Sequence, residues 1–145
     1  MNAIYFDMDG TIADLYHQPN WLKRLREFDP KPYKNAEPMV DVRKLKNLLE
    51  AHKARGVKVG VISWLAKGST PAYDKEVMVA KVDWLEEHFG LGFFDAIHVV
   101  PYGTPKHEIA KEQNAILFDD NSSVRKTWNL GAAYTENDIF KVLEG

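Results

Sequence analysis

Two pairs of carboxylates stand where the sequence could bring them side by side. Asp7 and Asp9 follow the first apolar run, and Asp119 and Asp120 follow a later one. If both runs are parallel strands of one sheet, their carboxyl ends meet at one crevice. Like charges about 4 Å apart repel by roughly 4 kcal/mol at an effective dielectric of about 20, so such a cluster needs a cation. Mg²⁺ suits it, because this ion takes one or two carboxylates, keeps several waters and shares the phosphate of a substrate.

A hydroxyl and an ammonium group can join the same crevice. Ser63 follows the apolar run that ends at Ile62, and Lys106 opens the segment that leads to the run before Asp119. A serine hydroxyl can donate to a phosphoryl oxygen, and a lysine supplies a point charge for the same phosphate. Taken alone, Ser63 also fits the polar start of a loop, and Lys106 also fits a solvated lysine at a helix end.

The elements that must position these residues are short apolar runs that alternate with helical stretches. An amphipathic stripe begins at Val42, with Asp41 as a helix cap and Gly56 as a stop. The alternation predicts an α/β fold: an open parallel sheet with right-handed crossovers and helices on both faces. The expected strands are Ala3–Phe6, Val57–Ile62, Ala96–Val100 and Ala115–Phe118, and the expected helices are residues 42–52, about Asp74 to His88, Lys106–Glu112, Ser122–Asn129 and Glu136–Leu143.

Two segments break this rhythm. Residues 14–38 contain Pro19, Pro30, Pro32 and Pro38 and are too few for a domain, which indicates a small insertion. Residues 67–73 are expected to be an irregular loop after the second strand, and loops at that end of a parallel sheet border the ligand crevice. We therefore expect a single domain over residues 1–145 with a cap-like insertion at about 14–38.

Composition excludes several classes of function. The chain has 145 residues, 45% of them hydrophobic, a net charge of −2 and no cysteine. The absence of cysteine excludes disulfide scaffolds, thiolate metal sites and cysteine nucleophiles. The net charge gives little support to a nucleic-acid binder, although it leaves room for a local basic patch. No run reaches the length of a membrane span, so we expect a soluble cytoplasmic protein that contacts no membrane.

The motifs, taken in order, resemble those of the haloacid dehalogenase (HAD) superfamily of phosphohydrolases. The stretch Asp7–Thr11 after an apolar strand is similar to the first motif of that family, and Ser63 is similar to the second. Lys106 corresponds to the third motif and the pair Asp119–Asp120 to the fourth. The resemblance extends from Ile4 to about Asn121 and implies a HAD-like, Rossmann-type sheet with a minimal cap.

The resemblance also implies roles at the phosphoryl group. Asp7 would be the nucleophile that forms an aspartyl-phosphate, and Asp9 would protonate the leaving oxygen and then take a proton from water. Ser63 and Lys106 would hold phosphoryl oxygens. Gly10 would allow a sharp turn beside the nucleophile.

The remaining implied roles concern the metal and the substrate. Mg²⁺ would be held by Asp7, the backbone carbonyl of Asp9, and Asp120. Asp119 would be either a water-mediated ligand or the residue that holds Lys106. Thr11 would stabilise the site by local hydrogen bonds and, like Gly10, Ser63, Lys106 and Trp64, lie against the substrate.

A narrower resemblance concerns the substrate. The stretch Lys81–Gly90 and the adjacent aspartates are similar to the 5′(3′)-deoxyribonucleotidase branch, which implies a nucleoside (deoxy)monophosphate as the leading substrate. That branch carries a larger helical cap than the insertion here. Aromatic contact with a base is expected from the residues bordering the strand ends, namely Trp64, Tyr73, Tyr16, Trp21 and Phe28.

Two other functions stay open. A small cap would also admit the 3′-phosphate of a nucleic-acid end, so a 3′-phosphatase is one alternative. The other is a phosphate-sensing module that keeps the aspartyl-phosphate without turnover, although receiver modules carry their acidic pair after the first strand. A calcium loop starting at Asp7 is excluded, because its sixth and twelfth positions are Ile12 and Gln18. The chain contains no Walker loop.

Overall fold

Five parallel strands form the centre of the molecule in the computed structural model, which describes residues 1–145. They are β1 (Ala3–Phe6), β4 (Lys58–Trp64), β5 (Ala96–Val100), β6 (Ala115–Phe118) and β7 (Ala133–Tyr134), in the order β5-β4-β1-β6-β7. The predicted α/β class and the four predicted strands are confirmed. Strand β4 continues two residues beyond its predicted end at Ile62, and the two-residue edge strand β7 was not predicted.

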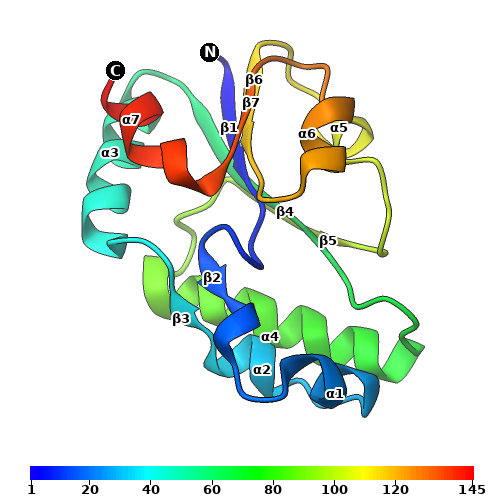
Figure 1. Cartoon of the computed structure of the whole chain (residues 1–145). Helices are drawn as coiled ribbons and strands as arrows, with labels where there is room; N and C mark the ends of the chain where they lie inside the picture. The colour runs from blue at the N-terminus through cyan, green and yellow to red at the C-terminus, as the bar shows by residue number, and fades with distance from the viewer.

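Helices cover both faces of the sheet, as Figure 1 shows. One face packs against α3 (Val42–Ala54), α4 (Pro71–Phe89) and α7 (Ile139–Glu144), and the other against α5 (Lys106–Ile109) and α6 (Ser122–Thr127). The alternation of strand side chains explains the two layers. In β1, Ile4 and Phe6 join the core of the first face, while Ala3 and Tyr5 join that of the second.

Several element ends differ from the predicted ones. Helix α4 begins at Pro71, so the irregular loop ends earlier than predicted, because the Thr70 side chain accepts from the amide of Tyr73 and caps the helix. The helices predicted over residues 106–112 and 122–129 end at Ile109 and Thr127. The last predicted helix is divided into a short 3₁₀ turn, η2 (Glu136–Asp138), and α7.

The insertion is a small helical layer below the sheet in Figure 1. The short strands β2 (Ala13–Asp14) and β3 (Glu37–Pro38) pair antiparallel at its base, and between them lie η1 (Leu15–His17), α1 (Trp21–Arg26) and α2 (Lys31–Asn35). Leu15 and Tyr33 of the insertion pack against Tyr73 and Val77 of α4. The first half of α4 therefore supports the insertion, while its second half covers the sheet through residues such as Trp84.

The strand order fixes where a ligand crevice belongs. From the central strand β1 the chain builds β4 and β5 on one side, and β6 and β7 on the other. The connections therefore change direction between β1 and β6, and ligands of such sheets bind beyond the carboxyl ends of the strands at that point. Phe6 of β1 is in register with Phe118 of β6, so Asp7 and Asp119 emerge at the same level.

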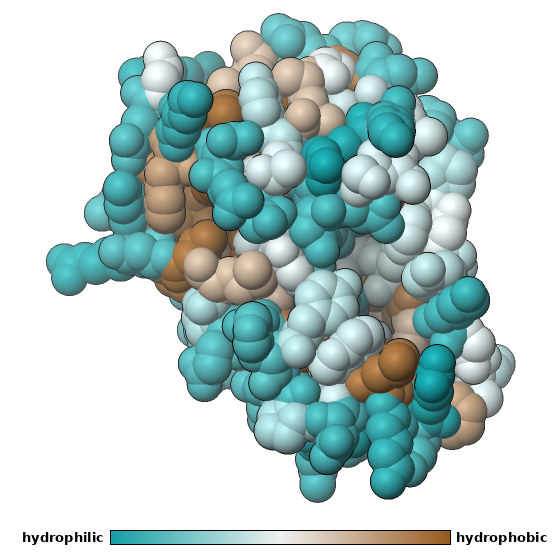
Figure 2. All heavy atoms as spheres, viewed as in Figure 1, coloured by the Kyte–Doolittle hydropathy of each residue, from teal (hydrophilic) through white to brown (hydrophobic).

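The surface agrees with a chain whose apolar residues are mostly inside. Figure 2 shows a largely hydrophilic face on which apolar residues form small patches, one of them over the helical insertion at lower right. None of the helices has both the length and the apolar character required to cross a lipid bilayer.

Candidate active site

Three carboxylates from the ends of β1 and β6 form one cluster. An oxygen of each of Asp7, Asp119 and Asp120 lies within 4.8 Å of the others. The ammonium group of Lys106, at the start of α5, donates to Asp7 Oδ1 and to Asp119 Oδ2, each at 2.8 Å. Lys106 is only 3% exposed, so this bridge is shielded from bulk water. The site thus joins residues that lie 99 and 13 positions from Lys106 in the sequence.

Hydrogen bonds fix the orientation of these acids. The buried Thr11 hydroxyl donates to Asp7 Oδ2 at 3.0 Å and accepts from the backbone amide of Asp120 at 3.1 Å. The backbone amide of Asn121 donates to Asp119 Oδ1 at 2.9 Å. Both oxygens of Asp119 therefore have partners inside the protein. Asp119 holds Lys106, one of the two roles that the sequence left open for it.

The cluster carries more negative charge than Lys106 neutralises. Burial, together with the charge of Asp7, raises the pKa of Asp119 to about 6 and that of Asp120 to about 8. Burial alone would lower the pKa of Lys106, but Asp7 and Asp119 beside it raise it. Three oxygen donors with one ammonium group fit a hard divalent cation such as Mg²⁺, which would relieve the remaining repulsion. Asp7 and Asp120 are more exposed than Asp119, so of the three they are the ones that could hold it.

Gly10 leaves the space that Asp120 occupies. Its φ of +81° lies in the left-handed region, and a Cβ atom built on it would lie 2.4 Å from Asp120 Oδ2 and 2.6 Å from a ring carbon of Tyr16. Only glycine can adopt this φ without strain and also leave room for Asp120 and Tyr16. The Asp-x-Asp-Gly-Thr turn therefore brings the end of β1 against the end of β6.

Asp9 lies in a separate polar group, built around a lysine that was not predicted as a site residue. Lys81 of α4 is 1% exposed, and its ammonium group donates to Asp9 Oδ2 at 2.9 Å, Ser63 Oγ at 2.7 Å and the Trp64 carbonyl at 2.7 Å. Burial raises the pKa of Asp9, while Lys81 opposes that rise. The signal for Lys81 was present in the sequence: it falls on the buried stripe of α4 with Val77.

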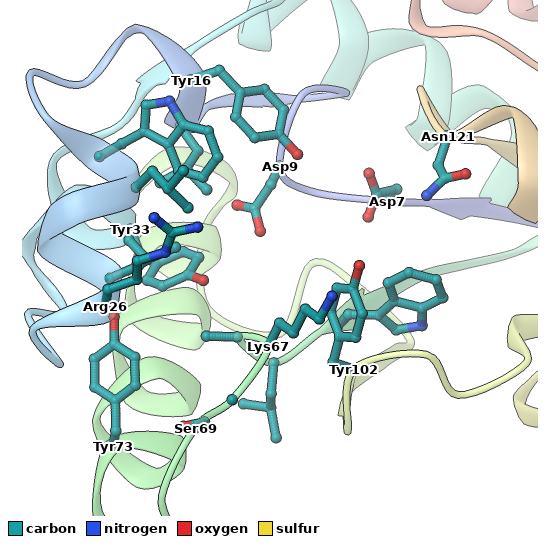
Figure 3. A pocket seen from close by; sticks show the side chains of 18 of the residues that line it. Asp7, Asp9, Tyr16, Arg26, Tyr33, Lys67, Ser69, Tyr73, Tyr102 and Asn121 are labelled. Carbon is teal, nitrogen blue, oxygen red and sulfur yellow. The ribbon is translucent and has the colours of Figure 1, made fainter.

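The two polar groups border one cavity of about 720 Å³ between the sheet and the insertion. Figure 3 shows the carboxylates of Asp7 and Asp9 directed into it, with the Tyr16 hydroxyl beside Asp9. Most of the opposite wall comes from η1, α1 and the loop after β4, with Tyr33 of α2 and Tyr73 of α4. The volume is within the range of pockets that enclose a small organic ligand and exceeds what a phosphate alone needs.

The cavity contains most, but not all, of the predicted site residues. Those lining it are Asp7, Asp9, Trp64, Lys106, Asp119 and Asp120. Gly10, Thr11 and Ser63 do not line it, because they are buried behind the acids. The Ser63 hydroxyl is engaged by Lys81, so in this conformation it supports the Asp9 side of the site. The ring of Trp64 lies 5.4 Å from the Lys106 ammonium group.

The five aromatic residues expected near the strand ends all line the cavity: Tyr16, Trp21, Phe28, Trp64 and Tyr73. Four of them pack edge to face as two pairs. Tyr16 and Trp21 have ring centroids 4.9 Å apart, and Phe28 and Tyr73 have theirs 5.5 Å apart. Each pair couples parts of the cap wall, so these rings serve packing as well as any contact with a ligand.

The residues of the wall that sequence reasoning missed include Arg26, Tyr33, Lys67 and Tyr102. Arg26 and Lys67 are cations on two segments that had been identified as bordering the crevice. Tyr33 is buried, and its ring lies 4.8 Å from the Lys81 ammonium group. No motif distinguishes these positions: Arg26 and Tyr33 depend on how the insertion folds over α4, and Lys67 and Tyr102 lie in the loops after β4 and β5.

A comparison of the sequence with models of known protein families finds no match, and a comparison with curated proteins finds none either.

Proposed function

We propose that this chain is a Mg²⁺-dependent phosphatase of the HAD type that hydrolyses a phosphomonoester through an aspartyl-phosphate. The observation that carries the proposal is the Lys106 bridge between Asp7 and Asp119, with Asp120 completing the acidic cluster at the cavity. A nucleophilic carboxylate, a fixed ammonium group and a set of metal ligands are the parts that phosphoryl transfer requires. The order of these residues along the chain agrees with the resemblance found in the sequence.

The metal would be held by Asp7 and Asp120, with the Asp9 carbonyl and Asp119 as the further candidates. When bound, Mg²⁺ supplies positive charge at the phosphoryl oxygens and keeps the phosphate from being repelled by the acids. Asp119 contributes mainly by holding Lys106, because its side chain is only 1% exposed, whereas that of Asp7 is 12% exposed.

In the first step an oxygen of Asp7 attacks phosphorus, and the bond from phosphorus to the leaving oxygen breaks. Thr11 and Lys106 each occupy one side of the Asp7 carboxylate, so they hold it in one orientation for that attack. Asp9 gives its proton to the leaving oxygen. Its buried position favours the protonated form that this role needs.

In the second step water attacks the phosphorus of the aspartyl-phosphate. Asp9, now ionised, takes the proton of that water, and the bond between phosphorus and Asp7 breaks. Lys106 remains beside Asp7 throughout and balances the charge of the carboxylate that is released. The products are inorganic phosphate and the alcohol, and both aspartates return to their starting states.

The leading substrate is a nucleoside (deoxy)monophosphate. A cavity of about 720 Å³ with several aromatic residues in its wall suits a phosphate that carries a flat ring. Stacking of a base on one aromatic side chain is worth on the order of 1–3 kcal/mol. The insertion is small, so its aromatic wall is the part of the cap that can provide this contact.

The test is hydrolysis of an aryl phosphate and of nucleoside monophosphates, with Mg²⁺ and with a chelator. We expect activity only with the metal, and Asp7→Asn should abolish it, because the amide cannot attack phosphorus. Asp83→Asn is the matched control, since Asp83 is exposed on α4 and does not line the cavity. Full activity of Asp7→Asn would disprove the assignment, and phosphorylation of Asp7 without turnover would favour the sensing module.

A further inference from the structure

The wall of the cavity carries two cations that have no acidic partner. Arg26 of α1 and Lys67 of the loop after β4 both line it. Neither side chain forms an ion pair or a hydrogen bond within the chain. Lys67 has only an aromatic neighbour, the ring of Tyr102 at 5.9 Å. Both cations are therefore available to an anion inside the cavity.

The other cations of α1 show that Arg26 differs from its neighbours. Lys23 pairs with Glu27 at 4.0 Å, and Arg24 pairs with Asp29 at 3.0 Å. Arg26 has no such partner, and Figure 3 shows its side chain on the cap side of the cavity, beside Tyr33 and across from Asp7. An arginine guanidinium in that place can bind a phosphate through two parallel hydrogen bonds.

The cations nearer the acids are already used. Lys106 is bound by Asp7 and Asp119, and Lys81 is bound by Asp9. Lys106 lines the cavity beside Asp7, where the reacting phosphoryl group would lie, whereas Lys81 does not line the cavity. Arg26 and Lys67 are the two remaining cations of the cavity wall. Because Lys106 already serves the reacting phosphate, the positive charges of Arg26 and Lys67 are free for a second anion.

We infer that the substrate is a nucleotide that carries a second phosphate group, which Arg26 contacts while the first phosphate reacts at Asp7. This inference rests on the proposed function and narrows its substrate class. The aromatic wall between the two ends would face the nucleoside, and Lys67 would balance the added charge. The second phosphate has two sources with the same chemistry: the free ester of a nucleoside bisphosphate, or the phosphodiester next to a phosphorylated oligonucleotide end.

The experiment compares three substrates that share one base: a nucleoside 5′-monophosphate, the 3′,5′-bisphosphate and a 5′-phosphorylated dinucleotide. The KM of the natural chain should be about tenfold lower for at least one of the two substrates with a second phosphate. Arg26→Gln should remove that advantage and leave the KM of the monophosphate within about twofold. Lys23→Gln is the matched control, because it removes one positive charge from the same helix outside the cavity wall.

The two outcomes of the substrate comparison distinguish the sources. A lower KM for the bisphosphate assigns the second group to a free nucleotide, and a lower KM for the dinucleotide assigns it to a nucleic-acid end. Equal KM values for all three substrates would overturn the inference while the phosphatase proposal stands. An equal effect of Arg26→Gln on all three would also overturn it.

Binding tests the inference even if no substrate is hydrolysed. Phosphonate analogues, in which a CH₂ group replaces the oxygen that hydrolysis would release, are titrated into the natural chain and Arg26→Gln with Mg²⁺ in a calorimeter. Tighter binding of the bisphosphonate than of the monophosphonate, lost in Arg26→Gln, supports the second anion site although the proposed activity has failed. Equal binding of the two analogues would reject that site.

Discussion

Lys81 donates a hydrogen bond of 2.9 Å to Asp9, a residue 72 positions earlier in the chain. The same ammonium group reaches Ser63 Oγ and the carbonyl of Trp64 at the end of β4. One buried cation therefore ties the loop after β1 to the end of β4 and to the middle of α4. Because a buried ammonium group is costly without partners, its three bonds fix both its own position and that of Asp9.

Lys81→Met should impair the acid and base step more than binding. Methionine fills a similar volume, but Asp9 loses its fixed partner and the positive charge that opposes the rise of its pKa. We expect kcat for a nucleoside monophosphate to fall about tenfold or more, with a smaller loss for an activated aryl phosphate that needs no proton. The limb of the pH profile that reports Asp9 should move to higher pH.

Lys75→Met is the matched control for that change, since Lys75 is exposed on the same helix. It should leave the pH profile and kcat unchanged. If Lys81→Met folds and shows the pH profile of the natural chain, Lys81 has no positioning role toward Asp9. A variant that unfolds is replaced by Lys81→Arg, which keeps the charge and should restore part of the activity.

Asp119 and Asp120 are neighbours with different partners, so their replacement should have different effects. If Asp120 is a Mg²⁺ ligand as proposed, Asp120→Ala should raise the Mg²⁺ concentration for half-maximal activity by about tenfold, with activity recovered at high Mg²⁺. Asp119→Ala leaves Lys106 with one partner fewer in a buried site. Its activity should stay low at every Mg²⁺ concentration, and its thermal midpoint should fall.

The measurement is activity against Mg²⁺ concentration for both variants, with thermal unfolding beside it. If high Mg²⁺ restored the activity of Asp119→Ala and not that of Asp120→Ala, Asp119 would be the metal ligand in place of Asp120.

The sequence was sufficient for the residues whose place follows from strand order. Asp7 and Asp119 each come directly after a short buried strand, and strands β1 and β6 are neighbours in register, so the two acids had to meet. The local sequence pattern determines where a strand ends, so this prediction did not depend on how the side chains pack. Trp64 was expected beside the end of β4 for the same reason, whereas Lys106 was expected from the motifs that the chain resembles, at the start of the helix that leads to β6.

The residues that escaped prediction depend on contacts between distant elements. Arg26 and Tyr33 face the cavity only because the insertion folds onto the first half of α4, and nothing in their local sequence fixes that direction. The hydrogen bond that the Ser63 hydroxyl accepts from Lys81 is a further contact between distant elements that the sequence did not predict. Lys81 lies on the apolar stripe of α4, and a buried lysine indicates that an acid lies opposite it.

Glu112 offers a test of pH dependence far from the acids of the cavity. Its carboxylate accepts hydrogen bonds from the Tyr5 hydroxyl and pairs with Lys58 at 3.5 Å. Burial alone would raise the pKa of Glu112, but these two partners, with a hydrogen bond from the Lys111 backbone, outweigh it and hold the pKa below its usual 4.5. The stabilisation by Glu112 is therefore complete above pH 4.5 and is lost as the pH falls through the lowered value.

Glu112→Gln should accordingly lower the free energy of unfolding by about 1 kcal/mol at pH 7. The difference from the natural chain should shrink as the pH falls below 4.5, the ordinary value for this carboxyl. Chemical unfolding between pH 3 and 7 measures it, with Glu108→Gln, at an exposed position of α5, as the control. A difference that stays constant over this range would show that the charge of Glu112 contributes nothing.

Gly10→Ala tests whether the turn after β1 sets the geometry of the acids. Alanine at a φ of +81° is strained by about 1 kcal/mol or more, and its Cβ would lie 2.4 Å from Asp120 Oδ2, so Asp120 would have to move. Gly92 has a φ of +74° and nothing within 4 Å of the added atom, so Gly92→Ala carries the strain without the clash. Both variants should lose thermal stability, but Gly10→Ala alone should also lose activity, by tenfold or more, and require more Mg²⁺. Equal activity of the two variants would show that Asp120 tolerates displacement and that its position at the cluster is not what the reaction depends on.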